Sequence, residues 1–168
     1  SKGWIPFSMG CAIVLGSNIG TTITPILASL SGNVAAKKAA LGHLLFNVFG
    51  TIWTVAVFYP FVDLNVWITE ALGQGNPTQL MDYASQLQAQ HPEIYQSIID
   101  GGSTNGIPAA IQFVKLQFAV SFGLSIFHTM FNMVNLTVMI WFTKTYVRIC
   151  NFLIKSKSKE ETEFQLQY

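Results

Sequence analysis

Charged residues are scarce in this chain of 168 residues, since only 10% are Asp, Glu, Lys or Arg. Soluble domains carry about a quarter. Two stretches have no charge at all, namely the 24 residues of 39–62 and the 28 residues of 116–143. Each exceeds the roughly 20 residues that a helix needs to cross about 30 Å of hydrocarbon. This lack of charge argues against an ordinary soluble domain and predicts an all-α membrane protein.

Other features are also missing. The two cysteines, Cys11 and Cys150, lie far apart in apolar segments, so we expect reduced packing residues rather than a disulfide framework. No basic patch with interleaved aromatic residues points to nucleic acid. No nucleophile–base pair and no histidine at metal-ligand spacing occurs, so we expect neither an enzyme nor a resident cofactor or metal. The start at Ser1, without Met or a signal peptide, indicates a piece of a longer protein.

The order of apolar and polar segments predicts four parts. Residues 1–62 are expected to hold a broken helix and a membrane-spanning helix at 35–61. Residues 63–107 are polar and rich in turn residues, with short helices expected at 78–90 and 92–99. The remaining parts are 108–155, with an interfacial helix at 108–122, a break at 123–125 and a spanning helix from 126, and the tail 156–168. One long tilted helix is the alternative for 108–155.

The charges predict an orientation. Lys37 and Lys38 precede the second apolar stretch, and five further basic residues follow the last one. Segment 63–107 instead has five acidic residues and no Lys or Arg. Because cytoplasmic loops are enriched in Lys and Arg, both basic flanks are expected in the cytoplasm, with segment 63–107 outside. The tail 156–168 would then be cytoplasmic and lead into a missing domain.

A polar run interrupts the first apolar segment. Gly16 and Gly20 allow backbone angles that other residues resist, and five hydroxyl or amide side chains stand beside them: Ser17, Asn18, Thr21, Thr22 and Thr24. We therefore predict a broken helix, with halves at 5–15 and 21–30 and unwound backbone over 16–20. The N-terminus of the second half would favour an anion, and unwound carbonyls could ligate Na⁺. Two alternatives stay open: a Gly-x-x-x-Gly packing face and a re-entrant hairpin.

Polar pairs recur in the later apolar segments. His43 and Asn47 are one helical turn apart, as are His128 and Asn132. Such residues usually bond across helices or to an opened backbone, and a substrate or proton role is the alternative. Several aromatic residues fit anchors at the membrane interface: Trp53, Trp67, Trp141, Tyr59 and Tyr146.

These residues together carry a resemblance. The run Gly-Ser-Asn-Ile-Gly-Thr-Thr-Ile-Thr at 16–24, followed by Gly-His-Leu-Leu-Phe-Asn at 42–47, resembles one repeat of the type II sodium–phosphate cotransporter family over residues 13–59. The His-x-x-Phe-Asn element recurs at 128–132. The family's Gln-Ser-Ser-Ser stretch is absent before residue 16, so the chain resembles the second of two inverted repeats. It would hold half of a binding site, completed by the missing first repeat.

The resemblance implies sodium-coupled transport of inorganic phosphate by alternating access, in a multi-pass protein of the bacterial inner membrane. On this hypothesis the N–H groups and hydroxyls of Thr21 and Thr22 face the anion. Ser17, Asn18, Gly20 and Thr24 help to hold phosphate or Na⁺, with Na⁺ at Ser17, Asn18 and Thr22. The implied partners are phosphate, Na⁺, the bilayer and the first repeat. A homo-oligomer is left open. The alternatives are a phosphate-sensing membrane scaffold and a transporter of another small anion.

Overall fold

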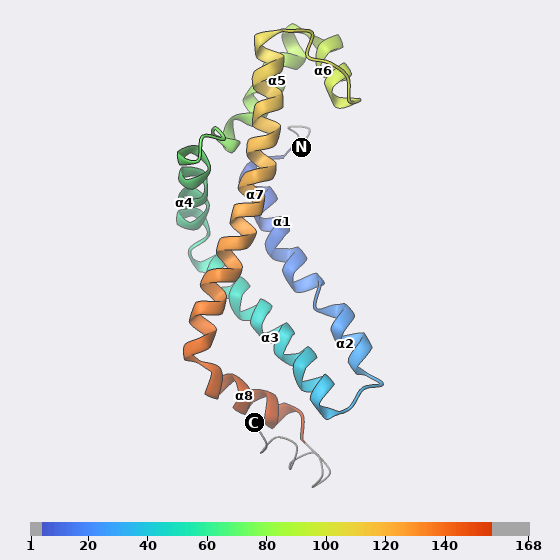
Figure 1. Ribbon diagram of the computed structural model, residues 1–168, viewed down its shortest axis with the longest axis vertical. Coiled ribbons are helices and arrows are strands. Elements are labelled where there is room, and N and C mark those ends of the chain that lie inside the picture. Colours follow the sequence, from blue (N-terminus) through green and yellow to red (C-terminus); the bar gives the residue numbers. More distant parts are fainter. Residues whose placement is uncertain (1–4, 156–168) are drawn as a thin grey trace. The chain divides into compact units, whose positions relative to one another are not determined.

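The computed structural model describes residues 5–155, and within them every regular element is a helix (Figure 1). The predicted cytoplasmic tail 156–168 lies outside the described residues. Three segments are long and apolar enough to span a membrane: Phe7–Ser29, Val34–Ala56 and Pro108–Trp141. The expected all-α membrane fold is therefore confirmed. The elements are α1 (Phe7–Gly20), α2 (Ile23–Ser29), α3 (Val34–Ala56), α4 (Phe58–Ala71), η1 (Pro77–Gln79), α5 (Leu80–Gln90), α6 (Pro92–Ile99), α7 (Pro108–Trp141) and α8 (Thr143–Leu153).

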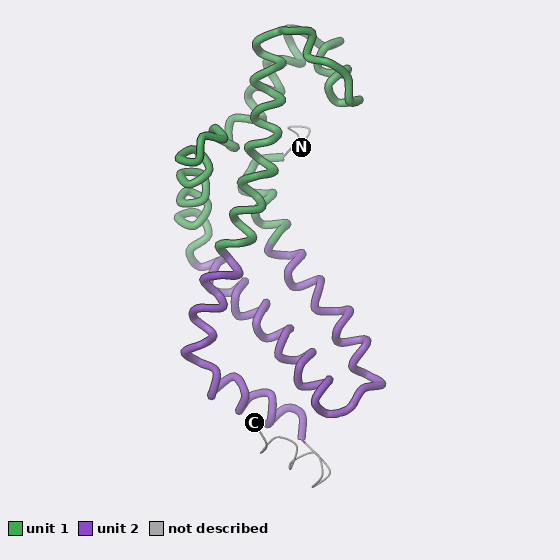
Figure 2. The backbone as a smooth tube through the Cα atoms, viewed as in Figure 1, with its two compact units in different colours: residues 1–14, 57–130 green, residues 15–56, 131–168 purple. Residues whose placement is uncertain are grey.

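The chain divides into two compact units, which Figure 2 colours separately. Unit 1 comprises residues 1–14 and 57–130, and unit 2 comprises residues 15–56 and 131–168. Helices α1 and α7 each contribute residues to both units. The four parts predicted from the sequence remain a prediction.

The second spanning helix is shorter than predicted. Helix α3 ends at Ala56, and after Val57 (φ −117°, ψ 29°) the chain starts the separate helix α4. Pro60 explains this position, because proline has no N–H for the carbonyl four residues earlier, which is that of Ala56, and its ring clashes with that carbonyl. Helix α4 extends to Ala71, so the beginning of the predicted loop 63–107 is helical rather than irregular.

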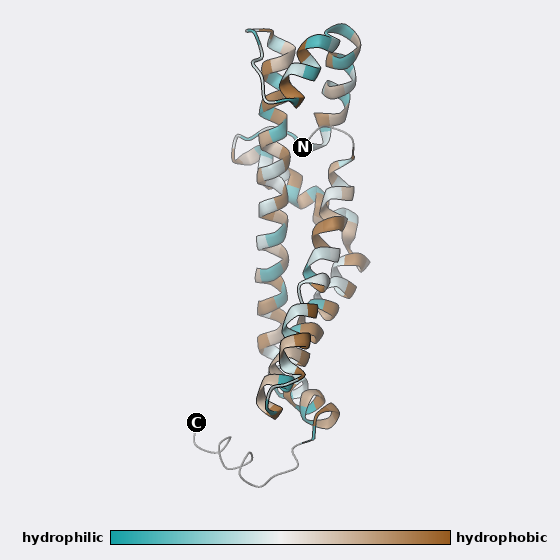
Figure 3. Cartoon of the chain, turned by 90° about the vertical axis from the view of Figure 1, so that its right-hand side faces the viewer, coloured by the Kyte–Doolittle hydropathy of each residue, from teal (hydrophilic) through white to brown (hydrophobic). Residues whose placement is uncertain are grey.

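The short helices of this polar segment are confirmed. Helix α5 is preceded by the 3₁₀ turn η1, where the Asn76 side chain accepts a 2.9 Å hydrogen bond from the Thr78 N–H. Helix α6 begins at Pro92, which suits a first helical position because its missing N–H would be unpaired there anyway. In Figure 3 these helices carry many hydrophilic residues. Their apolar faces bury Leu87 and Tyr95 in unit 1.

The packing of α6 against the start of α7 is expected to depend on Phe113. This side chain is fully buried, and its ring centroid lies 5.7 Å from that of Tyr95. Phe113→Ala should cost about 3–5 kcal/mol of local stability, because it leaves a cavity. Hydrogen exchange of the α5 and α6 amides measures this loss. Phe118→Ala, on the exposed side of α7, is the matched control and should leave that exchange unchanged.

The long helix α7 corrects the predicted break. It runs without interruption from Pro108 to Trp141, so the break expected at 123–125 is wrong. The alternative of one long helix over 108–155 holds as far as Trp141, where the separate helix α8 follows. Gly123 is a position of close packing, since a β-carbon there would lie 2.9 Å from Cζ of Phe7. The Ser125 hydroxyl donates to the Ser121 carbonyl at 3.0 Å, which satisfies it within the helix.

Unit 2 is held together by contacts between α3, the end of α7 and α8. The buried Asn135 of α7 donates from Nδ2 to the carbonyl of Phe46 at 2.9 Å. Helix α7 ends at Trp141, and Phe142 (φ −102°, ψ 11°) separates it from α8. The Tyr146 hydroxyl of α8 fits against Gly42 of α3, where a β-carbon would lie only 2.7 Å from it.

Candidate functional site

The polar run of the first segment does contain a break, but at a different place from the one predicted. Helix α1 continues through Gly16 to Gly20, and only Thr21 and Thr22 separate it from α2. The prediction that 16–20 are unwound is therefore wrong. Pro25 accounts for the position, since it cannot donate to the carbonyl of Thr21 four residues earlier and its ring crowds that carbonyl.

The backbone at the break is more fully bonded than the sequence suggested. The Thr21 N–H donates to the Ser17 carbonyl at 2.9 Å, and the Thr22 N–H donates to the Ile19 carbonyl at 3.0 Å. The expectation that these two N–H groups are free to bind an anion is therefore wrong. Their hydroxyl protons are also engaged, because Thr21 Oγ1 donates to the Asn18 carbonyl at 2.9 Å and Thr22 Oγ1 donates to the Ile19 carbonyl at 2.7 Å. The oxygen lone pairs of both hydroxyls can still accept.

The predicted site residues fall on two faces of the broken helix. Asn18 and Thr22 are one turn apart and buried, on the same face as the apolar Leu15. The second face is polar and exposed within unit 2; it consists of Ser17, Gly20, Thr21 and Thr24. The structure therefore brings the six residues into one short segment, with a buried pair beside an exposed polar stripe.

Asn18 is the unusual member of this group. It is 6% exposed, and its Nδ2 is a buried donor with no hydrogen-bond partner among the described residues. Thr51 Oγ1 on α3 is likewise buried and has no hydrogen-bond partner among the described residues. An amide donor left unpaired away from water costs roughly 1–3 kcal/mol. Asn18 therefore has an unpaired N–H group that could donate a hydrogen bond to an acceptor oxygen.

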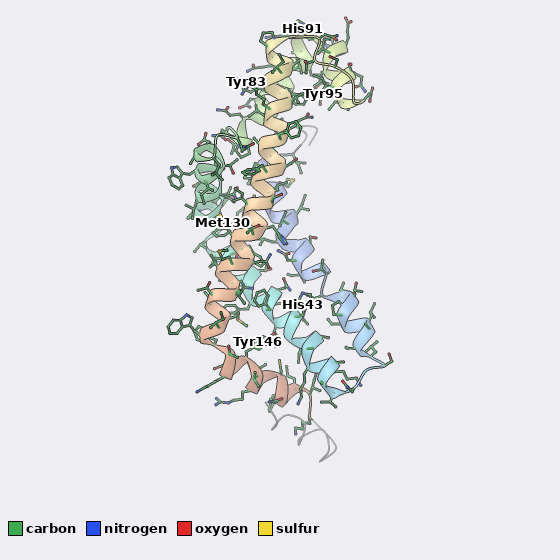
Figure 4. All side chains as sticks on the ribbon, viewed as in Figure 1. His43, Tyr83, His91, Tyr95, Met130 and Tyr146 are labelled. Carbon is green, nitrogen blue, oxygen red and sulfur yellow. The ribbon has the colours of Figure 1, made fainter. Side chains whose placement is uncertain are left out.

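The two His–Asn pairs differ from one another. In the first pair His43 is exposed and projects from α3 (Figure 4), whereas Asn47 is buried and donates from Nδ2 to the His43 carbonyl at 3.0 Å. Asn47 is thus bonded to its own helix backbone. In the second pair, His128 is exposed and Asn132 is half-buried one turn later on α7.

Sequence reasoning missed Asn135, which connects α7 to α3. Its Oδ1 accepts a 3.4 Å hydrogen bond from Trp53 Nε1, and the Trp53 ring stacks on Phe131 at a centroid distance of 6.4 Å. Trp53 is half-buried within unit 2, and its expected role as an anchor at the membrane interface stays a prediction. The two residues are far apart in the sequence and meet only in the folded chain, so no local sequence pattern predicts this bond.

Asn65 was missed for another reason, since it falls in the segment predicted as an external loop. It lies on α4, is fully buried, and donates from Nδ2 to the Gly123 carbonyl at 3.1 Å. Its Oδ1 has no partner among the described residues. Thr69, one turn later, donates to the Asn65 carbonyl at 2.9 Å and completes a polar cluster in unit 1.

The fold and the site define the class as an all-α membrane protein with a polar break in its first spanning segment. No protein-family model matches the chain, and no solved structure matches it. Among curated proteins, it is 39% identical over 87 residues to YqeW of Bacillus subtilis, an uncharacterized protein. That match covers 52% of this chain and 27% of YqeW.

Two further relatives have functional names. YjbB of Escherichia coli, named as an inorganic phosphate export protein, is 22% identical over 165 residues, which is 98% of this chain and 22% of YjbB. Sodium-dependent phosphate transport protein 2B of Homo sapiens is 38% identical over 78 residues, 44% of this chain and 11% of that protein. The resemblance to a sodium–phosphate cotransporter-like family is thereby confirmed at low identity. The chain spans about a quarter of the length of YqeW and YjbB.

Proposed function

We propose that the chain is a piece of a membrane transporter for inorganic phosphate, coupled to Na⁺ and working by alternating access in the cytoplasmic membrane, and that it carries half of the binding site. The names of the similar proteins support phosphate transport. Sodium coupling is supported by the name of one relative and by the acceptor groups at the helix break. The topology proposed from the charges places segment 63–107 outside and the basic flanks in the cytoplasm.

The exposed polar stripe, which consists of Ser17, Gly20, Thr21 and Thr24, is the observation that carries this proposal. It lies in a segment apolar and long enough to span the membrane. Polar side chains at membrane depth face protein or a water-filled cavity rather than lipid. The stripe therefore needs a covering surface, and the rest of a longer protein would supply it. A site shared between this stripe and a first repeat is the simplest arrangement that meets this need.

The chemistry at the break suggests separate roles for its residues. Asn18 Nδ2 is an unpaired donor and could form a hydrogen bond to an oxygen of phosphate. The hydroxyls of Thr21 and Thr22 donate hydrogen bonds to carbonyls, so the lone pairs of their oxygens suit a cation such as Na⁺. The Thr21 carbonyl loses its helical donor at Pro25 and is a further Na⁺ ligand. Ser17, Gly20 and Thr24 would complete the surface that faces the substrate.

Flux measurements on the full-length protein test this function. Reconstituted in liposomes, it should move radiolabelled phosphate, and an imposed Na⁺ gradient should accelerate the flux, whereas an equal K⁺ gradient should not. Reversing the Na⁺ gradient should reverse the favoured direction. Phosphate binding without flux would identify a sensor instead. Equal competition by sulfate would identify a less selective anion transporter.

A further inference from the structure

Charge is segregated between the two units. Among the described residues, every charged side chain of unit 2 is basic: Lys37, Lys38, Lys144, Arg148 and Lys155. The described part of unit 1 instead carries five acidic residues and one lysine, Lys115. Unit 2 therefore presents a positive charge that nothing in its own described residues neutralises. This favours a negatively charged ligand there.

Helix α8 combines this charge with apolar surface. Lys144 and Arg148 are four residues apart and share one face, which Asn151 continues. Phe152 and Ile149, on the adjoining face, are exposed. A short helix with a basic face and exposed aromatic or aliphatic residues typically lies in the plane of the membrane interface. Its place directly after α7, which is a candidate span, fits such a position.

Two pockets adjoin each other at Tyr146, within unit 2. One is apolar and measures about 240 Å³, with a lining that includes Leu45, Phe49 and Met139. The other is more polar and measures about 390 Å³; it is lined by Lys38, Tyr146, Val147, Cys150 and Asn151. Tyr146 lines both, and Figure 4 shows it on α8. An ammonium beside a phenol and an amide, next to an apolar cavity, suits a ligand with a phosphate and a hydrocarbon chain.

The protonation states of side chains that line the polar pocket agree with binding of a phosphate group. Burial, with a smaller effect from nearby Cys150, raises the pKa of Tyr146 above its ordinary value, so its hydroxyl stays protonated and can donate. Burial likewise raises the pKa of Cys150, and the charge of Lys38 partly offsets this effect. Lys38 itself lines the polar pocket.

We propose that the polar pocket between the start of α3 and α8 binds the headgroup of an anionic phospholipid. Lys38 pairs with the lipid phosphate, the Tyr146 hydroxyl and the Asn151 amide donate to its oxygens, and part of an acyl chain occupies the apolar pocket. Free phosphate would leave the apolar pocket empty, so the lipid is the better fit. The positive-inside orientation places this site at the cytoplasmic leaflet, where anionic lipids generate a negative surface potential.

Lipid titration of the full-length protein, followed by native mass spectrometry, tests the proposal with phosphatidylglycerol and phosphatidylcholine of identical acyl chains. The wild type should bind phosphatidylglycerol more tightly. Lys38→Gln should reduce this preference about fivefold, which is the scale of one basic residue near an anionic surface. Tyr146→Phe keeps the ring and should give a smaller reduction. Lys115→Gln, which removes an exposed cation of unit 1, is the matched control and should change nothing.

Three results would overturn the proposal. The wild type could bind both lipids equally, which would also follow if other segments of the full-length protein cover α8. Lys38→Gln could retain the full preference while its helical circular dichroism matches the wild type. Inorganic phosphate at millimolar concentration could displace the bound phosphatidylglycerol, which would assign the pocket to free phosphate. None of these results depends on whether the protein transports phosphate.

Discussion

Asn18→Ala is expected to lower phosphate flux through the full-length protein by at least about tenfold. The Asn18 amide is buried and its Nδ2 lacks a partner among the described residues, so under the proposed function this N–H group donates to a phosphate oxygen. A hydrogen bond to a charged group contributes about 1.5–3 kcal/mol, which corresponds to roughly a tenfold to a hundredfold effect. Asn18→Asp should reduce flux further, because a second negative charge would face the anion.

Ser29→Ala is the matched control for Asn18. Ser29 is also a buried polar residue of the broken helix, but its hydroxyl is already satisfied by the Ile26 carbonyl at 2.7 Å. Its removal should leave the initial rate of phosphate uptake within about twofold of the wild type, as expected for a locally bonded group. Uptake that survives Asn18→Ala unchanged, in both rate and half-saturating phosphate concentration, would remove Asn18 from the site.

The two prolines show what the sequence could have predicted about the breaks. The polar run and its glycines indicated an interrupted helix, and an interruption is present, but the glycines do not cause it. Pro25 places the break at Thr21, and Pro60 ends α3 at Ala56, each four residues earlier in the chain. This rule is local and could have been applied to the sequence alone. Gly16 and Gly20 fit an α-helix without strain, so their presence indicated tolerance of a break rather than its position.

The interhelical contacts could not have been predicted in the same way. The His-x-x-Phe-Asn pattern drew attention to Asn47 and Asn132, whereas Asn135 forms the bond between α7 and α3. Likewise Gly123 suggested a helix break, yet its missing side chain makes room for Phe7 and Thr69. Such contacts join residues more than 50 positions apart, and they depend on which faces of two helices meet. Composition and periodicity locate the helices but leave these faces undetermined.

Gly50→Ala is expected to destabilise the protein by about 2–3 kcal/mol. A β-carbon at Gly50 would lie 2.5 Å from Asn135 Nδ2 and 2.7 Å from Phe131 Cζ, so these two fully buried side chains would have to shift. Overpacking of this kind typically costs about 1–3 kcal/mol. It would also disturb the Asn135 hydrogen bond to the Phe46 carbonyl. Unfolding of the full-length protein by sodium dodecyl sulfate in mixed micelles, followed by circular dichroism, measures the change.

Two further variants separate the clash from a general effect of replacing glycine. Gly16→Ala lies in a helix with no atom within 4 Å of the added carbon, so it should be neutral or stabilising by up to about 1 kcal/mol through helix propensity. Asn135→Ala removes one of the two clashing groups, so Gly50→Ala should cost less in that background, with a coupling of about 1 kcal/mol or more. Strict additivity of the two substitutions would show that Gly50 and Asn135 are not in contact in the membrane.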